Sequence, residues 1–454
     1  MFTRLKRTAD PRPKEPVLTV VPASATPEPA DDFIDLRVRL HQRLITDEID
    51  LTAVERMPRA QFESEVGDII RDMLKREAVT LSDEQKKRLV AEVLDELLGL
   101  GPLEPLLKDH TINDIIVTTS QQVCVERAGK IEMTPVRFRD DAHLVRIINK
   151  IVAAVGRRID ESSPIVDARL RDGSRVNAVI PPVAVDGPLL SIRKFAKLPY
   201  DLPRLVGVGT ITPEMQTVLE AMVRGKLNIL ISGGTGSGKT TMLNALSAVI
   251  DHSETIVTVE DAAELQLQQP IVRRLETRPP NVEGKGSIMQ RELVVTALRM
   301  RPNRIILGEV RNGEAFDMLQ AMNTGHEGSM STIHANTPRD ALSRLEQMIG
   351  MAGMEMAPRS IRNQIASAIH VVVQLARGSD GRRRLTSIHE ITGMEGDVIT
   401  ANEIFRFRRT STDPEGKIHG YYESTGIRPR FAEELATQNL VLPTNIFAQN
   451  RRLE

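Results

Sequence analysis

Aromatic residues and cysteine are nearly absent from this chain, and long apolar runs are absent altogether. Tryptophan is missing and aromatic residues make up 3% of the sequence, which weakens any function that depends on stacking nucleic-acid bases. The single cysteine, Cys124, excludes an intramolecular disulfide framework and a four-cysteine zinc site. No apolar run approaches the roughly 20 residues that a membrane-spanning helix needs.

Positive and negative charges are balanced. Lys and Arg total 60, Asp and Glu total 61, and the net charge is −1. This balance removes bulk attraction to nucleic acid or anionic lipid, so only a local basic patch could support such binding. The basic N-terminus, MFTRLKRTADPRPKEP, has no apolar core behind its charges and does not fit a secretory signal. With 41% hydrophobic and 27% charged residues, the 454-residue chain fits a soluble globular protein of about three domains.

The composition changes twice within the first hundred residues. Residues 1–31 hold six prolines and little apolar surface, so they are predicted to be a solvated, disordered tail, with a tether to a partner as the alternative. Residues 32–98 are predicted to form a helical bundle. Its clearest helix begins at Ser82 with the capping box SDEQ, and an apolar face at three-to-four-residue spacing follows.

Short strands replace the helical pattern after residue 98. Residues 99–196 are predicted to form a smaller α/β domain. Its expected elements are strands at 115–117, 123–125 and 176–180 and a helix over 140–155. Cys124 lies in one of these apolar strands and is predicted to be a core residue. Residues 197–210 are predicted to be a linker, because Pro199 and Pro203 resist both helix and central strand.

Strands and helices alternate in the last domain, residues 211–454. Thr212 and Pro213 begin a helix that ends at Gly225. The expected strands are 227–232, 255–260, 304–309 and 329–334, and the expected helices are 239–249, 288–300, 314–322 and 338–348. Nearly continuous apolar strands that alternate with helices predict a parallel sheet covered on both faces.

The strongest local signal is a phosphate loop. The sequence GGTGSGKTT follows the apolar strand and opens the next helix, as phosphate binding by backbone N–H groups requires. The glycines permit the backbone conformations of such a loop, the lysine supplies a cation for the β- and γ-phosphates, and Thr240 can ligate Mg²⁺. The predicted nucleotide-binding residues are Gly233, Gly234, Thr235, Gly236, Ser237, Gly238, Lys239, Thr240 and Thr241.

Acidic residues follow two of the predicted strands. Glu309 ends the strand RIILGE, where Gly308 stands in place of the Asp that often precedes such an acid. In a parallel sheet this position lies beside the phosphate loop, so Glu309 is predicted to hold Mg²⁺ through water or to orient the attacking water. The second acidic cluster, Glu260, Asp261 and Glu264, could serve metal contact or water activation.

Two histidines bracket the predicted strand 329–334. Eight residues separate His326 from His334, and an even separation along a strand would place both on the same face. Without a third spaced ligand they do not make a metal site.

Taken together, these motifs resemble the secretion ATPase superfamily, the hexameric motors of type II and type IV secretion and of type IV pili. The phosphate loop, TVEDAAEL, RPNRIILGEVRNGEA and TGHEGSMSTIHANTP occur in that family's order. The segments GPLEPLLKDHTINDIIV, PIVDARLRDGSRVNAVIPP and GYYESTGIRPRF look most like the CpaF-type ATPase of Flp/Tad pilus assembly. The likeness runs from about residue 85 to the end. It implies an α/β chain with a C-terminal RecA-like core, a smaller α/β domain and a preceding helical bundle.

The resemblance also implies roles for particular residues. Glu309 matches the acid of the strand motif, and Glu260, Asp261 and Glu264 match the acidic motif. His326 and His334 match the histidines thought to sense the γ-phosphate and to link sites between subunits. Arg169 and Arg175 fall where the family places arginines that reach the nucleotide, with the turn signal Asp172-Gly173 between them. Arg193 is a weaker candidate. Asn312 stands where relatives often have Asp, which puts that residue's role in doubt.

The expected activity is ATP hydrolysis with Mg²⁺, coupled to movement between two domains. The resemblance implies a homohexamer that works with inner-membrane pilus platform proteins, docked from the cytoplasm and without obligate nucleic acid. Two alternatives stay open: a nucleic-acid translocase of a conjugation or type IV secretion system, and a nucleotide-gated assembly switch. A GTPase is disfavoured because no N-K-x-D motif follows the phosphate loop.

Overall fold

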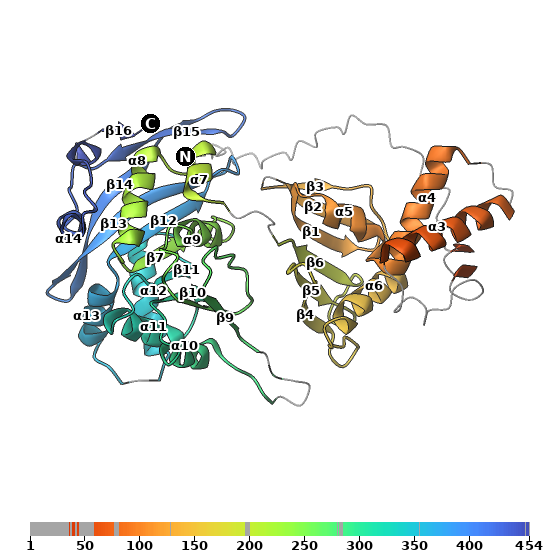
Figure 1. Cartoon of the computed structure of the whole chain (residues 1–454), viewed down its shortest axis with the longest axis horizontal. Coiled ribbons are helices and arrows are strands. Elements are labelled where there is room, and N and C mark those ends of the chain that lie inside the picture. Colours follow the sequence, from red (N-terminus) through yellow and green to blue (C-terminus); the bar gives the residue numbers. More distant parts are fainter. Residues whose placement is uncertain are drawn as a thin grey trace, which may run out of the picture. The chain divides into compact units, whose positions relative to one another are not determined.

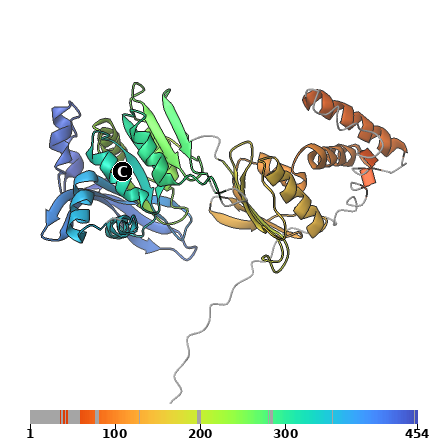
Figure 2. The same cartoon turned by 90° about the horizontal axis from the view of Figure 1, so that it is seen from below.

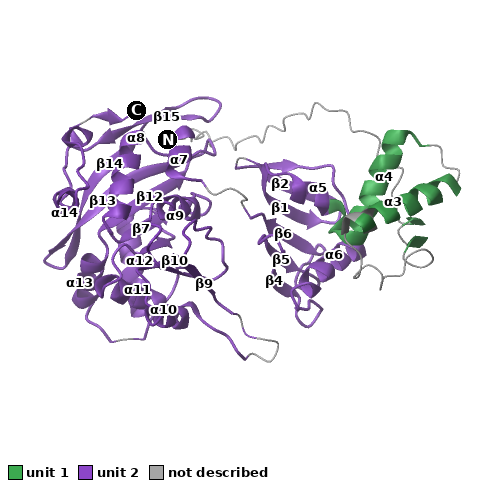
Figure 3. Ribbon diagram, viewed as in Figure 1, with its two compact units in different colours: residues 1–102 green, residues 103–454 purple. Residues whose placement is uncertain are grey.

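The computed structural model describes most of the chain after residue 58. The described residues are Leu36, Arg39, Leu40, Arg43, Leu44, 59–76, 81–127, 129–195, 200–278, 280, 285–353, 355–449 and 451–453. The predicted tail, 1–31, lies outside them. The chain divides into two units, residues 1–102 and 103–454 (Figure 3), and each is described by itself.

Two helices make up most of the described part of the first unit. They are α3 (Arg59–Arg76) and α4 (Asp83–Leu98), and their apolar faces share one core. The predicted capping box is confirmed: the Gln85 N–H donates to Ser82 Oγ at 3.2 Å, and the Ser82 N–H donates to Gln85 Oε1 at 2.9 Å. Two of the N–H groups that a helix start leaves unpaired are thereby satisfied, so α4 begins where the sequence predicts.

An antiparallel six-stranded sheet opens the second unit. Its strands are β1 (Ile112–Thr119), β2 (Gln122–Arg127), β3 (Lys130–Met133), β4 (Ile165–Arg169), β5 (Arg175–Val179) and β6 (Leu189–Arg193), in the order β3-β2-β1-β6-β5-β4. The helices here are the short 3₁₀ turn η2 (Gly101–Leu103), α5 (Glu104–Lys108) and α6 (Asp141–Ala153). The apolar face of α6 is buried, and Cys124 is buried on β2 as predicted. The predicted strands at 115–117, 123–125 and 176–180 correspond to β1, β2 and β5.

The expectation of a non-helical linker at 197–210 is wrong for its described part. Helix α7 (Leu202–Gly207) lies within it, and residues 197–199 lie outside the described residues. The Arg204 N–H donates to the Asp201 side chain at 2.9 Å, which caps the helix. Pro203 sits in the first turn, where a missing N–H removes no helical hydrogen bond, so proline favours this position instead of breaking the helix. Leu202 and Leu205 are buried in the core that follows.

A ten-stranded sheet forms the rest of the second unit (Figure 1). Its strands are β7 (Ile229–Gly233), β8 (Ile256–Glu260), β9 (Val272–Glu276), β10 (Arg304–Val310), β11 (Met330–Ile333), β12 (Val371–Arg377), β13 (Arg383–Glu395), β14 (Val398–Thr412), β15 (Ile418–Ser424) and β16 (Arg452–Leu453). The helices are α8 (Pro213–Arg224), α9 (Lys239–Ser247), α10 (Gln290–Leu298), α11 (Glu314–Asn323), α12 (Pro338–Gly350), α13 (Pro358–Ala368), α14 (Phe431–Thr437) and the 3₁₀ turn η3 (Thr444–Phe447).

The strand order places the phosphate loop in the middle of the sheet. The order is β16-β15-β14-β13-β12-β7-β11-β10-β8-β9. Strands β9, β8, β10, β11, β7 and β12 run parallel, so their carboxyl ends meet at one edge. The remaining strands continue the sheet as antiparallel ribbons, an extension that the sequence analysis did not anticipate.

Helices cover both faces of the parallel strands (Figures 1 and 2). On β7, Ile229 and Ile231 pack into one core with α7, α8 and α9, while Leu230 packs into the other with α10 to α13. Every residue of β7 and β8 is buried, which explains why apolar residues predominate in both strands. The expected α/β fold class is confirmed. Within the described ranges, no helix is both long and apolar enough to cross a membrane.

Candidate functional site

The phosphate loop connects β7 to α9. Gly236 and Gly238 have φ of 68° and 98°, conformations in which a side chain would be strained. Gly238 is the residue before α9, so the loop delivers the chain directly into the N-terminus of that helix. Free N–H groups and the helix dipole therefore favour an anion at this point.

Lys239 is held at the loop by backbone carbonyls. Its Nζ donates to the carbonyl oxygens of Gly233 and Gly234, each at 3.0 Å, and the residue is 8% exposed. Burial lowers the pKa of Lys239, and the negative charge of Glu309 opposes that shift. The ammonium group can exchange these carbonyls for phosphate oxygens, since both are oxygen acceptors.

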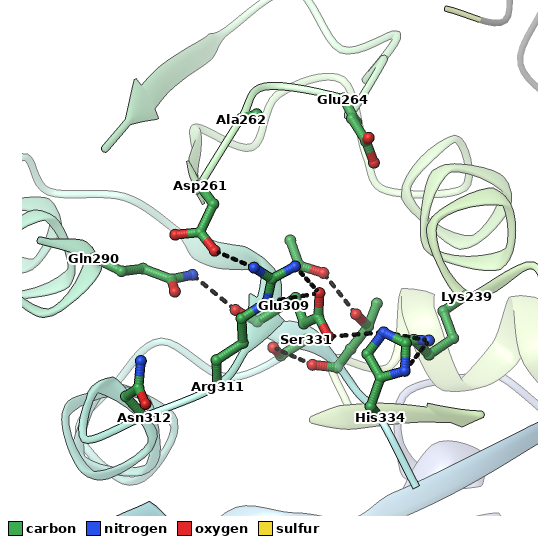
Figure 4. A network of polar contacts seen from close by, with 12 residues as sticks. Lys239, Asp261, Ala262, Glu264, Gln290, Glu309, Arg311, Asn312, Ser331 and His334 are labelled. Carbon is green, nitrogen blue, oxygen red and sulfur yellow. Dashed lines mark hydrogen bonds and ion pairs between the residues drawn. The ribbon is translucent and has the colours of Figure 1, made fainter. Parts of the chain in front are cut away.

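His334 lies between Lys239 and Glu309, the acidic residue on β10 (Figure 4). Its Nε2 lies 3.0 Å from Glu309 Oε1, and its ring nitrogens lie 3.2 and 3.4 Å from Lys239 Nζ. Burial lowers the pKa of His334, the negative charge of Glu309 opposes that shift, and the nearby cations Lys239, Arg344 and Arg311 lower the pKa further. In the tautomer with its proton on Nε2, the ring donates to Glu309, while Lys239 Nζ lies at similar distances from both ring nitrogens.

Arg311 is a site residue that the sequence analysis missed. Its Nε and Nη2 lie 3.0 and 2.7 Å from Glu309 Oε2, and its Nη1 lies 3.0 Å from Asp261 Oδ2. The guanidinium therefore joins the strand acid to the acidic cluster (Figure 4). The spacing could have indicated this residue. Side chains two positions apart on an extended chain point to the same side of it, so Arg311 follows Glu309 on the side that faces the site.

The turn after β10 is fixed by hydrogen bonds to the backbone. Gln290 donates to the Glu309 carbonyl oxygen at 2.8 Å, and Glu314 Oε1 accepts from the N–H groups of Arg311 and Asn312. The Asn312 side chain is drawn apart from the Glu309 network in Figure 4. These contacts hold Glu309 at the edge of the sheet where the carboxyl ends of the parallel strands meet, called the carboxyl edge below.

One carboxylate oxygen of Glu260 closes the loop that follows β8. Its Oε2 accepts from the N–H groups of Glu264 and Leu265 at 2.7 and 2.9 Å, and the residue is 3% exposed. Burial raises the pKa of Glu260. Little room is left beside it, because a Cβ at Gly308 would lie 3.0 Å from Glu260 Cγ. The glycine that replaces the usual Asp therefore makes room for an acid from the neighbouring strand.

Adding a methyl group at this contact should destabilise the fold. Gly308→Ala is expected to lower the free energy of unfolding by about 1–3 kcal/mol, the usual cost of overpacking a full core. Denaturant unfolding followed by circular dichroism measures this change. Gly350→Ala is the matched control, because a Cβ at Gly350 meets nothing within 4 Å. Equal stability of the two variants would show that the Glu260 side chain moves aside for the added methyl group at no cost in free energy.

Arg169 and Arg175 face each other across β4 and β5. They are direct cross-strand partners, and Arg193 is the next residue in the same row. Arg175 Nε lies 2.9 Å from Glu264 Oε1, and Arg169 Nη1 lies 3.1 Å from Glu276 Oε2. These contacts bring the arginines to the acidic cluster and to β9. Their contact with a nucleotide stays a prediction.

The prediction that His326 and His334 share one strand face is wrong. Strand β11 covers only residues 330–333, and His326 precedes it in a turn in which Gly325 and Gly328 have φ of 91° and 81°. The Gly328 N–H bonds to Asn228 Oδ1, just before β7 begins. His326 therefore lies toward the amino ends of the strands, whereas His334 lies at their carboxyl ends. The alternation rule does not extend through a turn.

Few side-chain oxygens at the phosphate loop could act as metal ligands, which fits an Mg²⁺ ion bound mostly by phosphate and water. Among the described residues, no cluster of three His, Cys, Asp or Glu side chains could hold a metal by itself. Mg²⁺ usually takes one or two protein oxygens and keeps several waters. Thr240 in the first turn of α9 and Glu309 on β10 provide such oxygens at the same edge of the sheet.

The chain belongs to the type II/IV secretion system protein family, whose model matches residues 96–422. A putative conjugal transfer protein of Mycobacterium tuberculosis is 38% identical over 335 residues, covering 72% of this chain and 94% of that protein. The type IV secretion system protein VirB11 of Bartonella henselae is 33% identical over 354 residues, covering 68% and 95%. The crystal structure of the VirB11 ATPase from Brucella suis, in complex with sulphate, is 28% identical, covers 64% and 96%, and superposes with a TM-score of 0.35.

The motif resemblance is thus confirmed at the level of the family. The names of these relatives belong to conjugal transfer and type IV secretion, which favours the secretion alternative over Flp/Tad pilus assembly. The CpaF-type assignment stays a prediction.

Proposed function

We propose that this chain is an Mg²⁺-dependent ATPase that powers a type IV secretion or conjugal-transfer machine at a bacterial inner membrane. The observation that carries the proposal is the continuous link from the phosphate loop through Lys239 and His334 to Glu309. It joins the group that would grip the terminal phosphates to the group that would position water. Flp/Tad pilus assembly is the second candidate, favoured by the segments that resemble the CpaF type.

In this proposal the chain's own groups act mainly by positioning and by charge. The N–H groups of the loop and of the start of α9 bind the phosphates, and Lys239 moves from the Gly233 and Gly234 carbonyls onto phosphate oxygens. Glu309 accepts a proton from, or orients, the attacking water. Mg²⁺, held by Thr240 and through water by Glu309, would neutralise charge on the β- and γ-phosphates.

The same network can report the loss of the γ-phosphate. When Lys239 leaves His334 for phosphate, His334 and Glu309 lose a neighbouring cation, and when phosphate departs the contact is restored. Arg169 and Arg175 would exchange their carboxylate partners for the γ-phosphate in the loaded state. Such differential contacts are what a two-state motion requires. A homohexamer would transmit that motion to membrane-embedded partner proteins.

Phosphate release by the purified full chain tests the proposal. With Mg²⁺ and ATP, turnover per subunit is expected to rise with protein concentration in step with the molecular mass in solution. DNA-stimulated, salt-sensitive activity would favour the nucleic-acid translocase, because counterion release makes such binding depend on salt. Assembly with ATP but without phosphate release at any concentration would leave only the nucleotide-gated switch.

A further inference from the structure

The hairpin that joins β12 to β13 brings two arginines to the phosphate loop. Strand β12 pairs in parallel with β7 and ends at Arg377. Strand β13 begins at Arg383, the direct cross-strand partner of Arg377. Both arginines therefore stand at the carboxyl edge, where the loop leaves β7.

These side chains lie against the two glycines of positive φ. Arg383 Nε donates to the Gly236 carbonyl oxygen at 2.9 Å. A Cβ at Gly238 would lie 3.3 Å from Arg383 Cδ, and a Cβ at Gly236 would lie 3.4 Å from Arg377 Nη1. Arg377 and Arg383 thus line one side of the phosphate loop, and this pair is called the arginine wall below.

The strand order assigns this wall to one end of the nucleotide. Strand β7 has β11 and then β10 on one side, carrying His334 and Glu309, and β12 on the other. A terminal phosphate that meets Glu309 lies on the β10 side. The rest of a triphosphate bound along the loop then extends toward β12, so its α-phosphate end meets the arginine wall.

Arg383 is available for an anion. Among the described residues its side chain has no carboxylate partner, and the guanidinium donates only to the Gly236 carbonyl oxygen. Arg384, by contrast, is buried and bound to Asp380 at 2.6 Å. Arg377 donates to the Gly129 carbonyl and lies 3.9 Å from Glu126, so it is partly committed. A guanidinium that holds only a carbonyl gains from exchanging it for a phosphate oxygen.

We propose that Arg383, with Arg377 beside it, binds the α-phosphate end of the nucleotide. This inference rests on the proposed function, since it requires a nucleotide in the loop. The contact is made to the part that ATP and ADP share. Arg383 therefore governs how tightly both are held, including the product, and does not act on the γ-phosphate.

Nucleotide affinity of the full chain with Arg383→Ala tests this proposal. The dissociation constants for ADP and for an ATP analogue with an imido bridge between its β- and γ-phosphates are each expected to rise about tenfold, the usual effect of losing one charge-assisted hydrogen bond. Arg383→Lys, which keeps the charge, is expected to recover part of the loss. Arg382→Ala is the matched control, because Arg382 is an exposed arginine of the same hairpin.

Two results would overturn the inference. Unchanged affinity for ADP in Arg383→Ala would remove the contact, and a loss confined to the ATP analogue would move it to the γ-phosphate. Lys239→Ala, measured alongside, separates this failure from a failure of the proposed function. If that variant also keeps full affinity for both nucleotides, the phosphate loop itself does not bind them. Matching thermal unfolding without nucleotide shows that the variants are folded.

Discussion

Lys239→Ala is expected to abolish ATP turnover, with a loss of at least about a hundredfold, the usual cost of removing one preorganised charge from a transition state. Lys239 is a cation that the structure holds at the loop, with its Nζ 3.0 Å from two carbonyl oxygens. Its removal takes away both a phosphate contact and the neighbour of His334. Phosphate release with Mg²⁺ and ATP measures the effect.

The control for this experiment is Lys417→Ala, which removes an exposed lysine of the turn between β14 and β15. It should leave turnover unchanged. Wild-type protein should also unfold at a higher temperature when ATP is added, because a ligand that binds only the folded state stabilises it. Lys239→Ala should lose most of that shift. Undiminished activity in this variant would remove the phosphate-loop assignment.

Glu309→Gln is expected to bind ATP and hydrolyse it slowly, with turnover lower by about 10²–10⁴-fold, the usual contribution of a positioned acid or base. Glutamine keeps the shape of the side chain but cannot take a proton from water. It also removes the anion that His334 and Arg311 contact at 3.0 and 2.7 Å. Single-turnover hydrolysis, measured beside the affinity for ATP, separates the chemical step from binding.

Glu327→Gln is the control, because Glu327 is exposed in the turn before β11, toward the opposite edge of the sheet. Near-normal turnover in Glu309→Gln would move the role of base to the acidic cluster. Within that cluster Glu264 would then be the stronger candidate. The bonded carboxylate oxygen of Glu260 is already occupied by two backbone N–H groups, and the residue is buried.

Local signals predicted the elements whose causes lie within a few residues. The capping box at Ser82, the helix that begins after Thr212 and the strand–loop–helix of the phosphate loop all appear where expected. Each depends on hydrogen bonds or backbone angles among neighbours in sequence, which residue types reveal directly. The buried strands β7 and β8 could also be predicted, because both faces of the sheet are covered there and apolar residues predominate in both strands.

The predictions were wrong or incomplete at helix α7, at the antiparallel strands and at the histidine pair. The sequence predicts Pro203 to be a linker residue, yet it stands in the first turn of α7, whose Leu202 and Leu205 are buried in the core. The antiparallel strands β13 to β16 were not predicted. The sheet was predicted from strands that alternate with helices, and antiparallel strands need no helices between them. The eight-residue spacing does not place His326 and His334 on one strand face, because a turn with two glycines of positive φ separates His326 from β11.

The amino-acid sequence by itself determined that a glycine loop would present N–H groups and Lys239 to an anion, because loop and helix start are contiguous. Only the tertiary structure decided which side chains meet there. The register of β10 beside β11 joins Glu309 to His334, and Arg311 then links Glu309 to the acidic cluster. The packing of Glu260 against Gly308 and of Arg383 against the loop likewise joins residues far apart in the chain. Contacts between residues so distant in sequence depend on strand order and on close packing, which local sequence patterns do not predict.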